Sequence, residues 1–465
     1  MLVVIALLLL AAWLLLQTPK VQTFAAKKAV AALEEKIDGR IEFSKVHFKP
    51  FNALVLKDVT MLDNNPVTLP DGERLDTIAK AKSITATFSL KGLLKKEGIH
   101  IKRVNVSDGS FTLVSDDNDT NIGRFLRSDK ENEGGKKEMG NVFDARKVEV
   151  DNFRFRMVNL KDGKPYAGHG IDWKDLDLTV DRLNATGVSL SNGYVKGSVE
   201  KLSAREKSGY EIVNLTGKTR VGGGRVTIQD LHLNDGMSRI HMPEYSMTFD
   251  DAGSFSHYLE DVRMTGNIKN SKLDSRSLSY FVPALKDKNV VLNIPKADID
   301  GTVSDLTVNR LDFEEAASGV KGSVEGRITG LPDVDGLDMD VALEDFSFTT
   351  EGLDRLVRNV APGAKVDLGK FAKGERISFD GKCKGKINDL DVDGKVSTPS
   401  LGMRSRRRKD SIHPRIRTRT RHHGTRFEPD LHHRSGISVG KRQNALPHGS
   451  LQNFRFRCGS GIRDR

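Results

Sequence analysis

ITATFSL, residues 84–90, shows the pattern that decides the fold, because Ile84, Ala86, Phe88 and Leu90 alternate with small polar residues. Successive side chains of a β-strand point to opposite faces, so this spacing predicts a strand with one apolar and one polar face. We therefore predict a mostly β chain from residue 40 onward. The same period of two recurs at Ile41 and Phe43, Leu54 and Leu56, Ile99 and Ile101, Val104 and Val106, Phe111 and Leu113, Val148 and Val150, Phe153 and Phe155, and Leu176, Leu178 and Val180.

Turn-forming residues punctuate these runs at spacings suited to hairpins and meanders. They occur at residues 63–66, 108–109, 161–163, 192–193, 235–236 and 380–381. Short helices are predicted only near residues 277–285 and 352–360. The charged, Gly-containing segment 129–141 predicts a linker or mobile loop, and we place a soft domain boundary there.

Alternation of this kind fits two architectures, a set of closed sandwiches or one continuous sheet curled into an open groove. We favour the elongated, curled, antiparallel-type sheet. An apolar groove would shelter an acyl chain, since each methylene kept from water contributes about 0.8 kcal/mol. The residues predicted to line it are Leu54, Leu56, Ile84, Phe88, Ile99, Ile101, Phe153 and Phe155.

The N-terminus is an unbroken apolar run from residue 1 to residue 16. We interpret residues 1–18 as a transmembrane anchor, with a cleaved signal peptide as the alternative. Residues 19–39 then predict an amphipathic helix ending at Gly39. The anchor residues are Leu2, Leu8, Trp13 and Leu16, and the apolar stripe of the helix is Ala26, Val30, Leu33 and Ile37.

The net charge of +11 is concentrated in one segment. Residues 404–465 hold 17 basic and 4 acidic residues, so the rest of the chain is close to neutral and offers no field for nucleic acid. Segment 403–465 shows no strand or helix pattern, which predicts a disordered tail or a frameshift product near Met403. A basic arm for nucleic acid or acidic lipid headgroups is the alternative.

Signals for chemistry are weak. Residues 117–121 begin like a calcium loop, but Ile122 and Ser128 stand where such a loop needs Gly and Glu. The triple glycine at 222–224 lacks the ending of a phosphate loop and predicts a turn or bulge. Cys383 and Cys458 cannot build a four-cysteine zinc site. We predict no catalytic residue, cofactor or metal, and no enzymatic activity.

Several segments resemble the AsmA-like N-terminal module of TamB-type proteins, particularly those of Bacteroidetes-like bacteria. The resemblance covers about residues 2–403. It rests on the anchor with its exit helix (LLLQTPKVQT, 14–23, then AKKA), the first hairpin (FNALVLKDV, 51–59), and segments 84–94, 99–104, 119–122, 201–210, 330–333 and 346–356.

The resemblance implies a single-pass bacterial inner-membrane protein with its body in the periplasm. Residues 40–128 would form the AsmA-like β module and residues 142–402 the β-groove repeats. The implied function is transfer of phospholipid or other acyl-chain cargo toward the outer membrane, and the alternative is assembly of outer-membrane or autotransporter β-barrel proteins. A C-terminal region reaching an outer-membrane β-barrel insertase, expected in this family, is missing from this sequence. A structural β-sandwich protein of the envelope is the third interpretation.

Overall fold

The computed structural model is mostly β, with 70% of its described residues in strands. One large, open, curled sheet contains the strands. The described residues are 23, 27, 38–49, 53–69, 72–88, 101–116, 119–126, 141–160, 166, 168–191, 194–331, 333, 336–360, 373–386, 389–399 and 452–457.

After two short strands before residue 50, the strands up to residue 206 are longer than those that follow. They are β1 (Gly39–Glu42), β2 (Lys45–Lys49), β3 (Ala53–Thr68), β4 (Arg74–Phe88), β5 (Ile101–Ser115), β6 (Asn141–Asn159), β7 (Asp175–Ser191), β8 (Tyr194–Glu206), β9 (Glu211–Gly222), β10 (Arg225–Asn234), β11 (Arg239–Thr248), β12 (Arg263–Asp274), β13 (Val291–Gly301), β14 (Asp305–Glu315), β15 (Lys321–Thr329), β16 (Asp338–Thr349), β17 (Arg376–Lys386), β18 (Asp389–Ser397) and β19 (Gln452–Arg457).

Short helices occupy some of the connections. They are α4 (Asn121–Leu126), η1 (Ala252–His257), α5 (Tyr258–Asp261), α6 (Ser275–Leu278), η2 (Pro283–Leu285) and α7 (Thr350–Val360). The helices predicted near 277–285 and 352–360 are thereby confirmed. Within the described residues, no helix has both the length and the apolar character needed to span a membrane.

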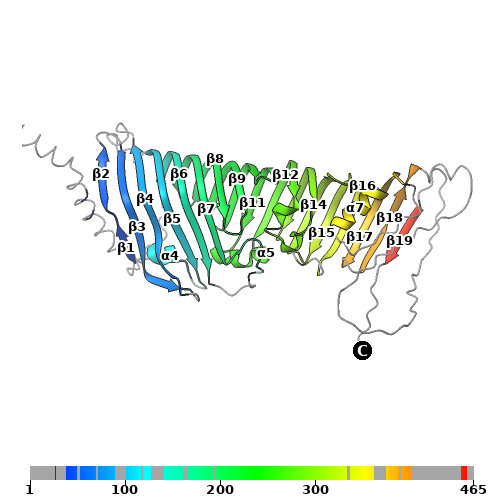
Figure 1. Cartoon of the computed structure of the whole chain (residues 1–465), viewed down its shortest axis with the longest axis horizontal. Coiled ribbons are helices and arrows are strands. Elements are labelled where there is room, and N and C mark those ends of the chain that lie inside the picture. Colours follow the sequence, from blue (N-terminus) through cyan, green and yellow to red (C-terminus); the bar gives the residue numbers. More distant parts are fainter. Residues whose placement is uncertain are drawn as a thin grey trace, which may run out of the picture. The chain divides into compact units, whose positions relative to one another are not determined.

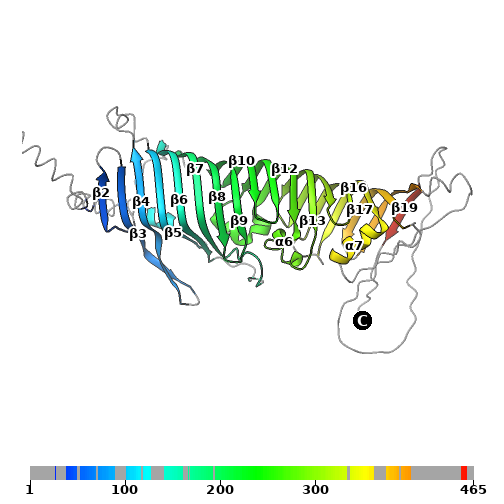
Figure 2. The same cartoon turned by 45° about the horizontal axis from the view of Figure 1, so that its top comes forward.

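The chain divides into two compact units. The first contains residues 1–236 and 244–262, and the second contains residues 237–243 and 263–465. In the first unit each strand from β2 to β10 pairs with the next along the chain (Figures 1 and 2). All of these pairs are antiparallel except β5 with β6, which is parallel. A parallel pair needs a long return connection, and the segment between β5 and β6 includes the charged residues at 129–140. This division of the chain lies elsewhere than the soft boundary predicted there.

The second unit is an antiparallel meander from β12 to β18, closed on its last edge by β19. Two buried clusters hold it together. Ile268, Ile294 and Ala297 form one, and Val320, Phe348 and Ile377 form the other, with Leu353 and Leu356 of α7 packed against the second. The amphipathic α7 therefore covers part of the apolar face of its own unit.

A line of left-handed residues crosses the strands. Asp58, Asp108 and Asn152 have φ of 50°, 52° and 53° in the middle of β3, β5 and β6, and they lie at one level of the sheet. Asp230, Asn270 and Asp345 in later strands also have positive φ, of 52°, 45° and 50°. Aspartate and asparagine tolerate this conformation better than most residues. Each such residue shifts the alternation by one place, as from Val150 to Phe153, which lets apolar side chains return to the same face.

Three predicted turns are wrong because the strands continue through them. Residues 63–66, 108–109 and 380–381 lie inside β3, β5 and β17, where Asp, Asn and Gly bend a continuing strand instead of ending it. The turn at 235–236 and the glycine turn between β9 and β10 are confirmed. Residues 161–163 and 192–193 lie outside the described residues.

Both predicted end segments fall largely outside the description. The anchor at 1–18 lies outside it, as does most of the helix predicted over 19–39. Thr23 and Lys27 are helical, but residue 38 is not, and Gly39 begins β1. In the tail, β19 pairs with β18, and this strand was not expected from the sequence. The frameshift hypothesis stays a prediction.

Candidate functional site

An unbroken row of aliphatic side chains crosses nine strands of the first unit. Each residue lies directly opposite the next on the neighbouring strand, so all of them share one face of the sheet. At about 4.8 Å between strands, the row from β3 to β10 runs for about 34 Å. We call this row the aliphatic ladder, and its members are Val46, Leu56, Ile84, Val106, Val150, Leu183, Leu202, Leu215 and Leu233.

Two further rows flank the ladder. One contains Met61, Ala79, Phe111, Phe155 and Leu178, in which the Phe111 and Phe155 rings stack with centroids 6.0 Å apart. The other runs through Leu54, Ala86, Val104, Val148, Ala185 and Val199. The apolar face is therefore several side chains wide.

The structure brings most of the predicted lining residues onto this face. Leu56 and Ile84 are opposite each other in the ladder, and Phe88 is opposite Ile101. Phe155 belongs to the stacked row, while Leu54 and Phe153 lie in rows beside the ladder. Ile99 lies outside the described residues.

The ladder is partly exposed from Leu56 to Leu233. Each of these side chains is shielded by its strand neighbours, but none reaches the burial of a packed core residue such as Ile377, which is 1% exposed. In the described part of the chain, no second sheet packs on this face. The structure thus has an open sheet in place of closed sandwiches.

The opposite face of the same strands is charged and largely neutralised. Arg154 bonds Asp177 through two nitrogens at 2.9 and 2.5 Å, and Arg182 and Arg205 pair with Asp151 and Asp181. Such exposed pairs contribute little stability, but they keep this face hydrated. The sheet of the first unit is therefore amphipathic, with an apolar face and a charged face.

One segment reaches across the open side of the first unit. Phe249, which follows β11, donates its N–H to Gly224 O at 2.9 Å, beside the end of β9. Tyr258 of α5 stacks on Trp173 at 4.3 Å, just before the start of β7. β7 and β9 run in the same direction, so these two contacts lie at opposite ends of the strands.

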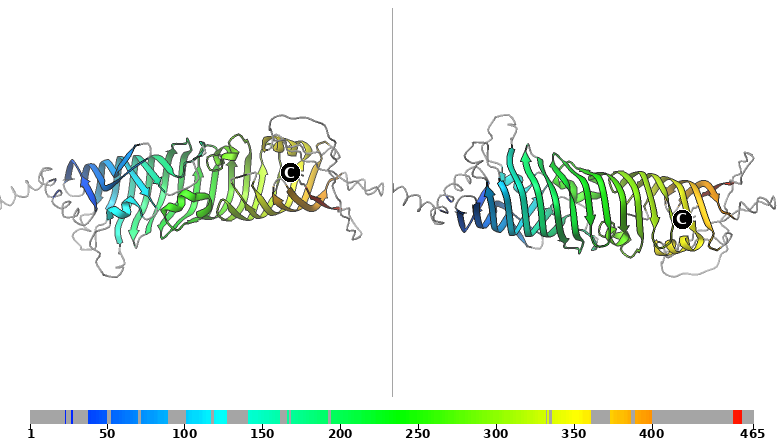
Figure 3. Two further views of the ribbon diagram at one scale, coloured as in Figure 1. Left: turned by 90° about the horizontal axis from the view of Figure 1, so that it is seen from below. Right: turned by 90° about the horizontal axis from the view of Figure 1, so that it is seen from above.

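This segment, η1 with α5, is called the strap. The nine residues that follow Phe249, up to Tyr258, are mostly helical and span less than about 20 Å. A flat twelve-residue strand, in contrast, is about 40 Å long. The strap can bridge the two strand ends only because the sheet is curled. The curl of the sheet is visible in Figure 3. Tyr245 hydrogen-bonds Tyr258 beneath it, and burial raises the pKa of Tyr245.

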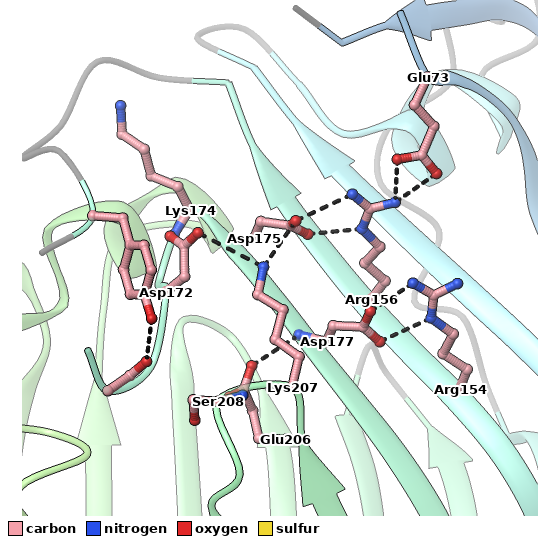
Figure 4. A network of polar contacts seen from close by, with 12 residues as sticks. Glu73, Arg154, Arg156, Asp172, Lys174, Asp175, Asp177, Glu206, Lys207 and Ser208 are labelled. Atoms are coloured by element: carbon pink, nitrogen blue, oxygen red, sulfur yellow. Dashed lines mark hydrogen bonds and ion pairs between the residues drawn. The ribbon is translucent and has the colours of Figure 1, made fainter. Parts of the chain in front are cut away.

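A polar cluster joins the end of β6 to the start of β7 (Figure 4). Arg156 bonds Asp175 at 2.7 and 3.1 Å and Glu73 at 2.8 and 2.9 Å, and it thus ties the β3–β4 hairpin to β6 and β7. Lys207 adds a contact of 2.9 Å to Asp175. Burial would raise the pKa of Asp175, but the bonds from Arg156 and Lys207 outweigh it and hold that pKa below its ordinary value. We call this cluster the clasp.

Sequence reasoning missed the ladder, the strap and the clasp. A signal for the ladder existed, because the alternation changes phase at a central Asp or Asn in KDV (57–59), SDG (107–109) and DNF (151–153). Of the residues considered for calcium, 119–121 are described and lie at the start of α4. Thr120 Oγ1 accepts the N–H of Gly123 at 3.0 Å, and Asn121 Oδ1 accepts the N–H of Val114 and Ile122 at 3.0 and 2.9 Å.

Comparison with protein-family models, curated proteins and solved structures finds no match to this chain. The resemblance to AsmA-like modules and the functions that it implies therefore stay predictions.

Proposed function

We propose that the first unit carries acyl chains along its aliphatic ladder, as part of a protein that moves phospholipid between the membranes of a bacterial envelope. The observation behind this proposal is the row from Leu56 to Leu233, which is continuous, aliphatic and partly exposed at every strand. A large exposed apolar surface on a folded chain marks a place where something else binds.

The form of the surface favours a linear apolar guest. The ladder has no glycine gap and no charged member between Leu56 and Leu233. A chain lying along it would exchange water for aliphatic contact at every strand, at about 0.8 kcal/mol for each methylene removed from water. Equal surroundings at successive strands give small barriers between positions, which suits movement more than tight storage. The inner-membrane anchor and the periplasmic setting of this proposal come from the apolar run at 1–16 and from the family resemblance.

A charge placed in the ladder tests the proposal. Leu183 and Asn184 are neighbours on β7 that face opposite sides, and both are partly exposed. We expect Leu183→Glu to lower transfer of a fluorescent phospholipid between vesicles by about tenfold or more, because a carboxylate interrupts the dry path. Asn184→Glu, with its charge on the polar face, is the matched control. Equal transfer by both variants and the parent chain would refute the acyl-chain function.

A second function is favoured by the edge of the second unit. β18 receives β19, a strand that begins more than fifty residues further along the chain, as its antiparallel partner. An edge that accepts a distant segment in this way is suited to adding a strand from another polypeptide, as an assembly factor for β-barrel proteins would do. Crosslinking of unfolded barrel substrate at Asp393, together with absence of lipid on the ladder, would favour this function over the first.

A further inference from the structure

Four basic side chains gather at one end of strands β8–β10 in the first unit. In the strand register Lys196 is opposite Arg220. Lys218 is opposite Ser198, in the next pair on the same face. Arg225 follows the glycine turn and shares their face, because it is opposite Gly222. All four side chains are exposed. We call Lys196, Lys218, Arg220 and Arg225 the basic rim.

These cations differ from the arginines elsewhere on the polar face. Arg154, Arg182 and Arg205 in this unit each pair with an aspartate. None of the four rim cations forms an ion pair with a described residue. Arg220 instead lies over the Tyr194 ring, 4.2 Å from its centroid, and Glu200, the next acidic residue on β8, bonds Thr186 at 2.9 Å. Four like charges held close together, with no ion pair to a described residue, repel one another, and an external anion would relieve that repulsion.

Exposed aliphatic side chains lie at the same end of the same strands. Val195 and Val221 are directly opposite each other and are 44% and 40% exposed. Val226 continues this row on β10, and the row lies on the apolar face, opposite to the basic rim. The strand ends thus present cations on one side and aliphatic groups on the other, with a tyrosine beside them.

We propose that this end of β8–β10 docks onto the surface of an anionic lipid bilayer. The four cations would contact the phosphate layer, while Val195 and Val221 would enter the boundary between headgroups and acyl chains, where aromatic groups such as Tyr194 are also favoured. An acidic protein or a nucleic acid would satisfy the cations but would leave the valines in water. The proposal goes beyond acyl-chain transport and does not depend on it.

A crosslinker at one position tests the contact without interference from other basic or apolar segments. The full chain, with a photoreactive amino acid in place of Val221, is mixed with vesicles of phosphatidylcholine alone or of phosphatidylcholine and phosphatidylglycerol in equal parts. Lipid adducts on the peptide that contains position 221 are then measured. Each basic side chain near an anionic surface is expected to strengthen binding by about fivefold. We therefore expect at least about tenfold more adduct with the anionic vesicles.

The matched variants change equal charge in two places. K196Q/K218Q/R220Q/R225Q removes the basic rim and should abolish the gain from phosphatidylglycerol. K286Q/K321Q/K382Q/K395Q removes four exposed lysines of the second unit and should retain it. A circular dichroism spectrum unchanged from that of the parent chain shows that each variant is folded.

Three outcomes would overturn the proposal. The first is equal capture from both kinds of vesicle, and the second is an unchanged gain in the rim variant. The third is equal capture that added polyglutamate suppresses, which would indicate an acidic protein partner. Failure of the Leu183→Glu experiment alone would remove the acyl-chain function and leave this docking surface intact.

Discussion

The two units build the same amphipathic meander but treat its apolar face differently. In the first unit the ladder consists of large aliphatic side chains that are partly exposed from Leu56 to Leu233. In the second unit one row of this face is Gly266, Ile299, Val308, Gly326, Val341, Cys383 and Val392, and Val308, Val341 and Cys383 are buried.

Glycines explain much of this difference. A Cβ on Gly381 would lie 2.6 Å from the Phe379 ring, and one on Gly322 would lie 2.8 Å from the Phe346 backbone. Phe379 and Phe346 thus occupy the space beside these glycines, and Phe346 also packs against the buried cluster that contains Phe348. The second unit thus covers part of its apolar face with its own residues, while Leu311, Val324 and Leu343 stay as partly exposed as the ladder. We infer that the partly exposed face of the first unit serves binding at a cost in stability, and that the second unit is the more stable of the two.

The largest expected effect separates a packed residue from an open one. Ile377→Ala removes a side chain that is 1% exposed, and we expect a loss of about 3 kcal/mol in the free energy of unfolding of the second unit. Leu215→Ala, in the partly exposed ladder, should cost the first unit only about 1 kcal/mol. Hydrogen exchange at the amides of β15–β17 and of β8–β10 measures the two separately. Equal losses would contradict the comparison.

Next in size is the clasp. Arg156→Gln removes the charge that holds Asp175 and Glu73, and the first unit should lose about 2 kcal/mol because two carboxylates are left with weaker partners. Arg327→Gln in the second unit breaks the pair with Asp305, whose groups are 63% and 47% exposed, and should have little effect. Urea unfolding followed by Trp173 fluorescence reports on the first variant. The account fails here if Arg156→Gln unfolds at the same urea concentration as the parent.

A smaller effect tests the bend of the strands. Asn152 has φ of 53°, a conformation that strongly disfavours β-branched side chains. Asn152→Val should destabilise the first unit by about 1–2 kcal/mol, while Asn152→Gly should be tolerated. Thermal unfolding of the pair decides the matter, since an equal response to valine and glycine would mean that the left-handed conformation is not required.

The smallest effect is a dependence on pH. The pKa of Asp175 in the folded chain lies below the ordinary value of 3.8, so its charge contributes stability at neutral pH. That contribution is lost as the pH falls below about 4 and through the folded pKa. Trp173 stands two residues away and should change its fluorescence in this range. In Arg156→Gln the change should begin at a higher pH, and identical titrations would argue against the clasp.

The strand content and the apolar face could be predicted from the sequence, because alternation at Leu54, Ile84 and Phe155 is a local property. The helices α6, η2 and α7 were predicted for the same reason, whereas α4, η1 and α5 were not expected. Strand boundaries could not, since Asp108 followed by Gly109 signals a turn in most sequences and becomes a bend only when neighbouring strands bend at the same level.

Long-range features were also beyond the sequence. The strap depends on Tyr258 meeting Trp173, and the clasp on Arg156 meeting Glu73, residues more than eighty positions apart. No local pattern encodes such a meeting. The basic rim was hidden by the near-neutral charge of the chain before residue 404, because neutrality over a long segment says nothing of where unpaired cations gather.

The difference between the two apolar faces is tested most directly by a phospholipid with a photoreactive group near the end of one acyl chain. Vesicles containing it are incubated with the full chain, and adducts are located by mass spectrometry of the peptides. The account predicts adducts on ladder residues of β3–β10, such as Leu183 and Leu215, and few on β15–β17. Adducts spread equally over both units, or confined to the polar face, would contradict it.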